Sequence, residues 1–139
     1  MYSLHVEDIN APVIICLCFR ALSEWQFGEI AASQVTIMEA ISLAKDLNDM
    51  HALALALYFA GLLAYFEYNH GEVERLASDL IELSTRQTFA TFLPLGAILR
   101  GWARSASGDT TEGISWIEDG IGDYRATGSI LTKIGRAHV

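Results

Sequence analysis

The sequence predicts an all-α fold in which antiparallel helix hairpins stack as a short α-solenoid of about six helices. Long segments rich in Ala and Leu dominate the chain, and the alternating Val, Ile and Thr patterns typical of strands are missing. A glycine followed by an acidic residue recurs, with spacings of 43 and 37 residues, at Gly28-Glu29, Gly71-Glu72 and Gly108-Asp109. Each glycine separates a strongly apolar segment from a more amphipathic one, and a recurrence of this length indicates repeated helix hairpins.

The first helix of each hairpin, the A helix, is apolar on several faces. Such a helix has to be covered both by its own partner and by a neighbouring hairpin. The second helices, the B helices, carry an apolar stripe, as Ile114, Ile117 and Ile121 show for the third one. The A helices are expected at about residues 12–25, 51–68 and 92–106, and the B helices at about 30–47, 73–84 and 111–127. The hairpins therefore span about residues 11–47, 50–86 and 91–127, within one helical domain of residues 1–133.

Residues typical of helix ends support these bounds. Asn10 can cap the first A helix, with Pro12 in its opening turn. Pro94 marks the first turn of the third A helix, or kinks that helix if it starts earlier. Gly128 is expected to end the last helix.

The chain is acidic, with 17 acidic against 9 basic residues and a net charge of −8. Because it has no basic stripe or polybasic patch, neither nucleic acid nor an anionic membrane surface is an expected partner. The uncharged stretch of residues 52–66 is 15 residues long, short of the roughly 20 that cross a bilayer. The N-terminus lacks the basic segment of a secretory signal, so a cytoplasmic location is expected.

The sequence predicts no catalytic, metal-binding or cofactor-binding residue, and so no enzyme. The four histidines have no metal-ligand spacing with one another or with the cysteines. Cys16 and Cys18 point in different directions on a helix and are expected to be two small buried side chains. Neither a P-loop nor a G-x-S-x-G motif occurs.

The chain resembles the tetratricopeptide-repeat family, in which the two helices of a pair cross at small residues. Small residues let helix axes approach to ~8–10 Å. Counted from each turn glycine, the residues at the crossing positions are mostly small: Ala21, Ala64 and Gly101 seven before it, Ser33, Leu76 and Gly113 five after it, and Ala40, Leu83 and Gly120 twelve after it. The likeness covers roughly residues 12–128 and is carried by the stretches ALALALYFAGLLAYFEYNHGEVERLASDLIELS and LRGWARSASGDTTEGISWIEDGIGDYRATG.

The variant that this chain most resembles is the diverged repeat array of large bacterial signalling proteins. Those arrays follow an ATPase module and sometimes a class III nucleotide cyclase domain, so the resemblance implies a regulatory scaffold. The spacing of 43 residues exceeds the family's usual period of about 34. We therefore expect longer helices or longer turns between the repeats.

The resemblance also implies a binding site, because the A helices of tetratricopeptide arrays line a concave groove. The residues expected to face this groove are Trp25, Tyr58, Tyr65, Tyr68, Asn69 and Trp102. Aromatic side chains with a polar tip offer much contact area at a small entropic cost, which suits peptide binding. The alternative is that these aromatic side chains fill the space between successive A helices.

The last six residues, IGRAHV, resemble the translation of a sequencing-library adapter. Residues 134–139 are therefore expected to be a non-native tail, and the chain to be a fragment of a longer protein.

The predicted function is that of a non-catalytic scaffold that mediates protein–protein interaction within a larger multidomain signalling or regulatory protein. Its partner is expected to be a protein or a peptide, or another domain of the same full-length protein. The alternatives are a self-associating helical domain and a small-molecule-binding one. A ligand pocket would need buried polar groups, for which the only candidates in the A helices are Arg20 with Glu24 and Arg100 with Arg104. We interpret these pairs as surface charges or as ion pairs within the stack.

Overall fold

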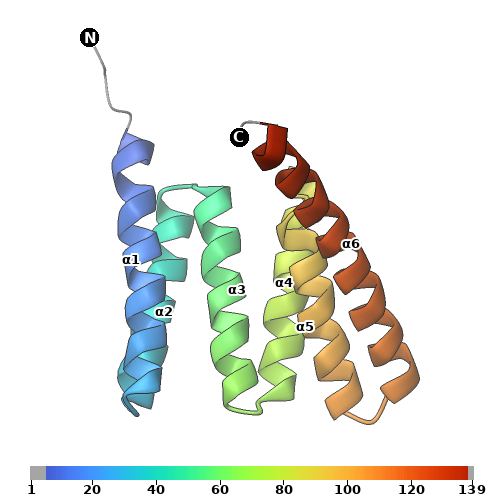
Figure 1. Ribbon diagram of the computed structural model, residues 1–139. Helices are drawn as coiled ribbons and strands as arrows, with labels where there is room; N and C mark the ends of the chain where they lie inside the picture. Colours follow the sequence, from blue (N-terminus) through green and yellow to red (C-terminus); the bar gives the residue numbers. More distant parts are fainter. Residues whose placement is uncertain (1–5, 138–139) are drawn as a thin grey trace.

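The computed structural model describes the backbone of residues 6–137 and the side chains of residues 12–127. This part of the chain holds six α-helices and no strand. The helices are α1 (Val6–Gln26), α2 (Ile30–Asp46), α3 (Met50–Phe66), α4 (His70–Gln87), α5 (Phe92–Ala106) and α6 (Thr110–Ala137). Figure 1 shows them as a row of three antiparallel hairpins standing side by side. The predicted all-α stack of helix hairpins is confirmed.

The A helices α1, α3 and α5 form the continuous layer of the stack. Each helix contacts the next one along the chain, and α3 also contacts both α1 and α5. The B helices stand apart, since no Cα atom of α2 comes within 8 Å of one in α4. Both of these B helices rest on α3, which is the most completely buried helix of the three. The space between α2 and α4 is thus closed by α3 on one side only.

The hairpin turns repeat every 40 residues, at Gly28, Tyr68 and Gly108, a regularity that the glycine pattern obscured. These three residues have left-handed backbone conformations, with φ of +83°, +56° and +108°. The next N–H in each turn closes the same type of bond, as from Asn69 to the Ala64 carbonyl at 3.0 Å. Gly71, the expected second turn glycine, lies instead in the first turn of α4. The spacings of 43 and 37 residues were therefore wrong landmarks, because a tyrosine takes the turn position that usually belongs to glycine.

This 40-residue period also corrects the second of the three predicted helix crossings. Aligned on the turns, the residue that matches Ala21 and Gly101 is Gly61 rather than Ala64. The outer hairpins cross as predicted: Ser33 Oγ donates a hydrogen bond to the Ala21 carbonyl at 2.7 Å. A Cβ added to Gly101 would lie 2.7 Å from the Gly113 carbonyl oxygen, so α5 and α6 approach as closely as their backbones allow.

Replacing Tyr68 with glycine is expected to raise the free energy of unfolding by about 1 kcal/mol, because a Cβ in the left-handed region is unfavourable by about that much. The Tyr68 side chain is 82% exposed, so little packing is lost with it. Urea unfolding measures the change. Tyr68→Ala is the matched control, since it removes the ring but keeps the Cβ, and its stability is expected to stay within ~0.5 kcal/mol of the parent. Equal gains in both variants would contradict the assignment of strain to this turn.

The start of α1 differs from the prediction. Asn10 and Pro12 were expected in the cap and the opening turn, but α1 begins at Val6 and both residues lie inside it. Pro12 is exposed, and water can replace the backbone hydrogen bond that a proline removes at an exposed position. Pro94 does lie in the first turn of α5, as expected.

The end of α6 also differs. Gly128 was expected to stop this helix, which instead continues to Ala137. A glycine inside a helix is unfavourable by only about 1 kcal/mol and does not end it unaided. The predicted non-native tail at residues 134–139 lies partly in the backbone of α6 and partly outside the described residues.

Candidate functional site

A groove runs between α2 and α4, with α3 as its floor. Its volume is about 630 Å³. On α2 the lining extends from Ile30 to Lys45, which at 1.5 Å per residue is a length of about 22 Å. The groove is therefore elongated along the helices rather than round. Its lining residues are Trp25, Ile30, Ser33, Gln34, Ile37, Met38, Ile41, Ser42, Lys45, Leu57, Ala60, Leu63, Ala64, Glu67, Asn69, Glu72, Arg75, Leu76 and Asp79.

The floor of the groove is apolar, and the α2 wall carries an apolar row beside the polar side chains of Ser33, Gln34, Ser42 and Lys45. Ile37 and Ile41 point from α2 into the groove, and Met38 beside them is 69% exposed. The floor consists of leucines and of two alanines one turn apart, Ala60 and Ala64. Because alanine side chains end at Cβ, the floor is deep at these two positions.

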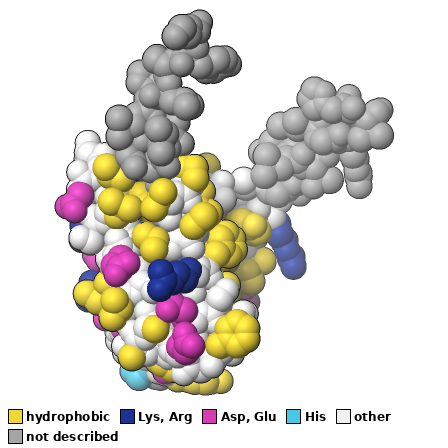
Figure 2. Space-filling model, turned by 90° about the vertical axis from the view of Figure 1, so that its left-hand side faces the viewer, with side chains coloured by type: hydrophobic (Ala, Val, Ile, Leu, Met, Phe, Trp, Pro, Cys, Tyr) yellow, Lys and Arg dark blue, Asp and Glu magenta, His cyan; other side chains and the backbone are white. Residues whose placement is uncertain are grey.

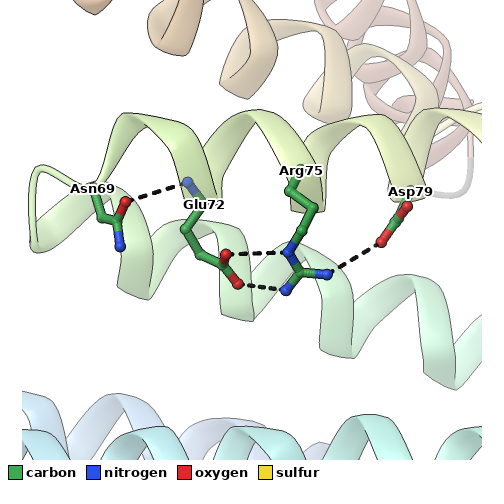
Figure 3. A network of polar contacts seen from close by, with 4 residues as sticks. All are labelled: Asn69, Glu72, Arg75 and Asp79. Carbon is green, nitrogen blue, oxygen red and sulfur yellow. Dashed lines mark hydrogen bonds and ion pairs between the residues drawn. The ribbon is translucent and has the colours of Figure 1, made fainter.

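The α4 wall is charged, and Figure 3 shows its side chains in a row along the helix. Asn69 caps α4 by accepting a hydrogen bond from the Glu72 N–H at 3.3 Å. The Glu72 carboxylate accepts two bonds from Arg75, one of them from Nε at 3.1 Å. The Arg75 guanidinium also lies 3.7 Å from the Asp79 carboxylate. The hydrogen bond from Arg75 lowers the pKa of Glu72, and the same bond raises the pKa of Arg75, so these two side chains keep their charges at neutral pH.

An aromatic side chain from α1, that of Trp25, also lines the groove. The Trp25 indole N–H donates a hydrogen bond to the Glu67 carboxylate, which joins the end of α1 to the end of α3. The Trp25 ring also lies 5.0 Å from the Phe66 ring, centroid to centroid. Trp25 is thus held on two sides while it lines the groove.

The structure does not bring the six predicted site residues together. Trp25 and Asn69 line the groove between α2 and α4, where Asn69 acts as the helix cap. Tyr65 and Trp102 contact each other across α3 and α5, with ring centroids 4.7 Å apart. Tyr58 is half-buried on α3. Its pKa is raised mainly by desolvation and to a smaller extent by the nearby Tyr124 phenol.

Tyr68, the sixth predicted residue, is in the exposed turn before α4 and contacts neither pair. The contact between Tyr65 and Trp102 is of the kind that the alternative interpretation expects, in which aromatic rings fill the space between successive A helices. Sequence reasoning missed the groove's α2 wall and Arg75, because it looked only to the A helices. Met38 could have indicated the α2 wall in the sequence, because it is a large apolar residue that lies outside the buried stripe of this helix.

The groove-equivalent position in the next hairpin is filled by an ion-pair cluster between α4, α5 and α6. Arg104 Nε lies 2.8 Å from the Glu74 carboxylate, and Arg100 Nε lies 3.6 Å from the same oxygen. Arg104 also lies 3.6 Å from Glu112, and the Arg100 guanidinium lies 4.3 Å from the centre of the Trp116 ring. The hydrogen bond with Glu74 raises the pKa of Arg104. Arg100 and Arg104, the second of the two predicted polar pairs, thus form ion pairs within the stack.

The other predicted polar pair lies at the first hairpin. Arg20 is 3.7 Å from Glu24, and the Glu24 carboxylate also accepts a 2.5 Å hydrogen bond from the Thr36 hydroxyl on α2. Of the two cysteines, Cys18 is buried as expected, and burial raises the pKa of its thiol to about 11. Cys16 is exposed, so the expectation that both are buried is wrong for it.

The α1 end of the stack presents apolar side chains to solvent. Figure 2 looks onto this end and shows hydrophobic side chains gathered in its upper part. On α1 the exposed ones are Val13 at 46%, Ile15 at 39% and Phe19 at 55%. Phe19 also packs edge-on against Phe59 of α3, at 5.2 Å between centroids.

Within the described residues, no three His, Cys, Asp or Glu side chains gather where they could hold a metal ion. In the same part of the chain, none of the helices is both long and apolar enough to cross a bilayer. Neither a protein-family model, nor a curated protein, nor a solved structure matches this chain.

Proposed function

We propose that this chain is a non-catalytic scaffold of tetratricopeptide type that binds a protein or peptide partner in the cytoplasm, as a piece of a larger signalling or regulatory protein. The observation that carries the proposal is the groove between α2 and α4. It combines an apolar floor, an apolar row on α2 that includes the exposed Met38, and a charged wall on α4. Peptide-binding grooves have this composition, in which apolar anchors supply affinity and charged edges supply orientation.

The shape of the groove favours a peptide over a compact small molecule. A volume of about 630 Å³ alone would suit either ligand. The length of about 22 Å along α2, however, matches four turns of a helix or about six residues of extended chain. Self-association remains the alternative, and the exposed Val13, Ile15 and Phe19 on α1 support it.

Selection of a displayed library of random twelve-residue peptides on the immobilised chain tests the proposal. We expect binders that retain affinity as free synthetic peptides. Their affinity for the Met38→Glu variant is expected to be lower by about tenfold or more, because this substitution puts a charge among the apolar residues of α2. Val35→Glu is the matched control, because Val35 is 59% exposed on the same helix and does not line the groove. Both substitutions are at exposed positions and are expected to change stability by less than ~0.5 kcal/mol.

Failure to enrich any peptide would contradict the proposed function. Enriched peptides that bind Met38→Glu and Val35→Glu equally well would place the binding site elsewhere and would remove the groove as its support.

A further inference from the structure

The groove over α3 has an equivalent place over α5 in the next hairpin, and a comparison of the two indicates the chemistry of the ligand. The 40-residue period of the turns makes Ala60 and Ala64 on α3 the equivalents of Arg100 and Arg104 on α5. Each pair lies on an A helix between two B helices. The hairpins therefore differ at this place by two guanidinium groups.

In the second and third hairpins the space over α5 is filled from within the chain. Arg100 and Arg104 both reach Glu74 on α4, at 3.6 and 2.8 Å. Arg104 also reaches Glu112 on α6 at 3.6 Å, and Trp116 covers Arg100. The side chains of the two arginines are only 25% and 30% exposed. Two basic side chains in this position are thus compatible with the fold and are matched by carboxylates.

In the first and second hairpins the same space over α3 is the groove. Ala60 and Ala64 line its floor, and Leu76 occupies the position of Trp116. Glu72, the equivalent of Glu112, still lines the α4 wall. The acidic side of the arrangement is thus partly kept, while the basic side chains that would fill it are gone.

The side chains around the groove carry a net negative charge. Three carboxylates line it, from Glu67, Glu72 and Asp79, against the two basic side chains of Lys45 and Arg75. Arg75 is already bonded to Glu72 and lies beside Asp79. The whole segment that builds the groove, residues 30–87, holds eight acidic and three basic residues. A basic ligand is attracted to such a surface, and an acidic one is repelled.

We propose that the groove between α2 and α4 binds a peptide segment that carries an arginine or lysine among apolar residues. Its basic side chain lies over Ala60 and Ala64, in the space that Arg100 and Arg104 fill in the next hairpin. Its apolar residues contact Ile37, Met38 and Ile41. This inference rests on the proposed function, since it names the chemistry of the partner for that same site.

The library selection that tests the proposed function also tests this inference, through the composition of the selected peptides. We expect arginine and lysine to be enriched at least threefold over their frequency in the unselected library, and aspartate and glutamate to be depleted. Raising the salt concentration from about 0.05 to about 0.5 M is expected to weaken binding several-fold, because charge attraction to an exposed surface is screened.

Filling the groove from within the chain is the sharper test. Ala64→Arg places in the groove the side chain that Arg104 places in the next hairpin. This substitution is expected to lower the affinity for the selected peptides at least tenfold. The double variant Gln34→Glu with Ala64→Arg recreates the Glu74–Arg104 ion pair at the equivalent positions of the groove. Because the new arginine then has a carboxylate partner, the double variant remains informative if the single variant is poorly folded. Glu82→Gln is the control, because Glu82 is exposed on α4 outside the groove.

Peptides without a basic bias, or peptides that bind the filled double variant as well as the parent, would overturn this inference while leaving a peptide-binding function in place. A selection that yields no peptide at all would overturn both.

Discussion

Replacing Gly113 with alanine is expected to lower the free energy of unfolding by about 3 kcal/mol, the upper end of the range for an added methyl group in a tight contact. A Cβ at this position would lie 2.2 Å from Ser105 Oγ, 2.5 Å from the Gly101 carbonyl oxygen and 2.7 Å from the Ser105 backbone nitrogen. Two of these atoms belong to the backbone of α5, which cannot rotate away as a side chain does. The only relief is for α5 and α6 to separate.

The loss is expected to be local. In the part of the chain that the structure describes, α5 is the only helix with a Cα atom within 8 Å of one in α6. In a stacked array each hairpin is stabilised mainly by its nearest neighbours, so an end helix can unfold before the rest. Urea unfolding followed by far-UV circular dichroism should therefore show a lower midpoint and also a shallower or two-step transition.

Gly122→Ala is the matched control, being the same substitution in the same helix. A Cβ on Gly122 meets nothing within 4 Å, so alanine there is expected to raise the free energy of unfolding by about 0.5–1 kcal/mol through its higher helix propensity. Opposite signs for the two substitutions identify the close approach at Gly113. A gain in stability from Gly113→Ala would show that α5 and α6 do not cross this tightly.

The hairpin architecture could be predicted from the sequence because it depends on local signals. Apolar A segments, amphipathic B segments and small crossing residues such as Ala21 and Gly113 are each visible in a short window of sequence. The period was harder to find, because the second turn depends on Tyr68 in a conformation that usually marks a glycine. Gly71, only three residues further on, supplied a false landmark.

The candidate site could not be predicted because it is defined by what is small rather than by what is reactive. Ala60 and Ala64 are indistinguishable in the sequence from the other alanines of a buried helix. Only the correct 40-residue alignment makes them the equivalents of Arg100 and Arg104, and only the structure shows that they line the floor of a groove between α2 and α4. The aromatic residues attracted the prediction instead, and four of the five, all except Trp25, lie outside the groove.

Replacing Leu80 with alanine is expected to lower the free energy of unfolding by about 3 kcal/mol through a different mechanism. Leu80 is completely buried in α4, and its Cγ lies 3.5 Å from where a Cβ on Gly96 of α5 would be. Alanine would leave a cavity at the contact between the second and third hairpins, and Leu→Ala substitutions in cores are unfavourable by about 2–5 kcal/mol.

The unfolding curve should distinguish this variant from Gly113→Ala. The middle hairpin contacts both of its neighbours, through α3 on one side and through both α3 and α4 on the other. Weakening it lowers the stability of the whole array, so the midpoint is expected to fall while the steepness of a single transition is kept. Leu93→Ala is the control, since Leu93 on α5 is 39% exposed and its truncation is expected to be unfavourable by less than about 1 kcal/mol. If Leu80→Ala instead gave the shallow transition expected of Gly113→Ala, the middle hairpin would not be the element that couples the two ends of the stack.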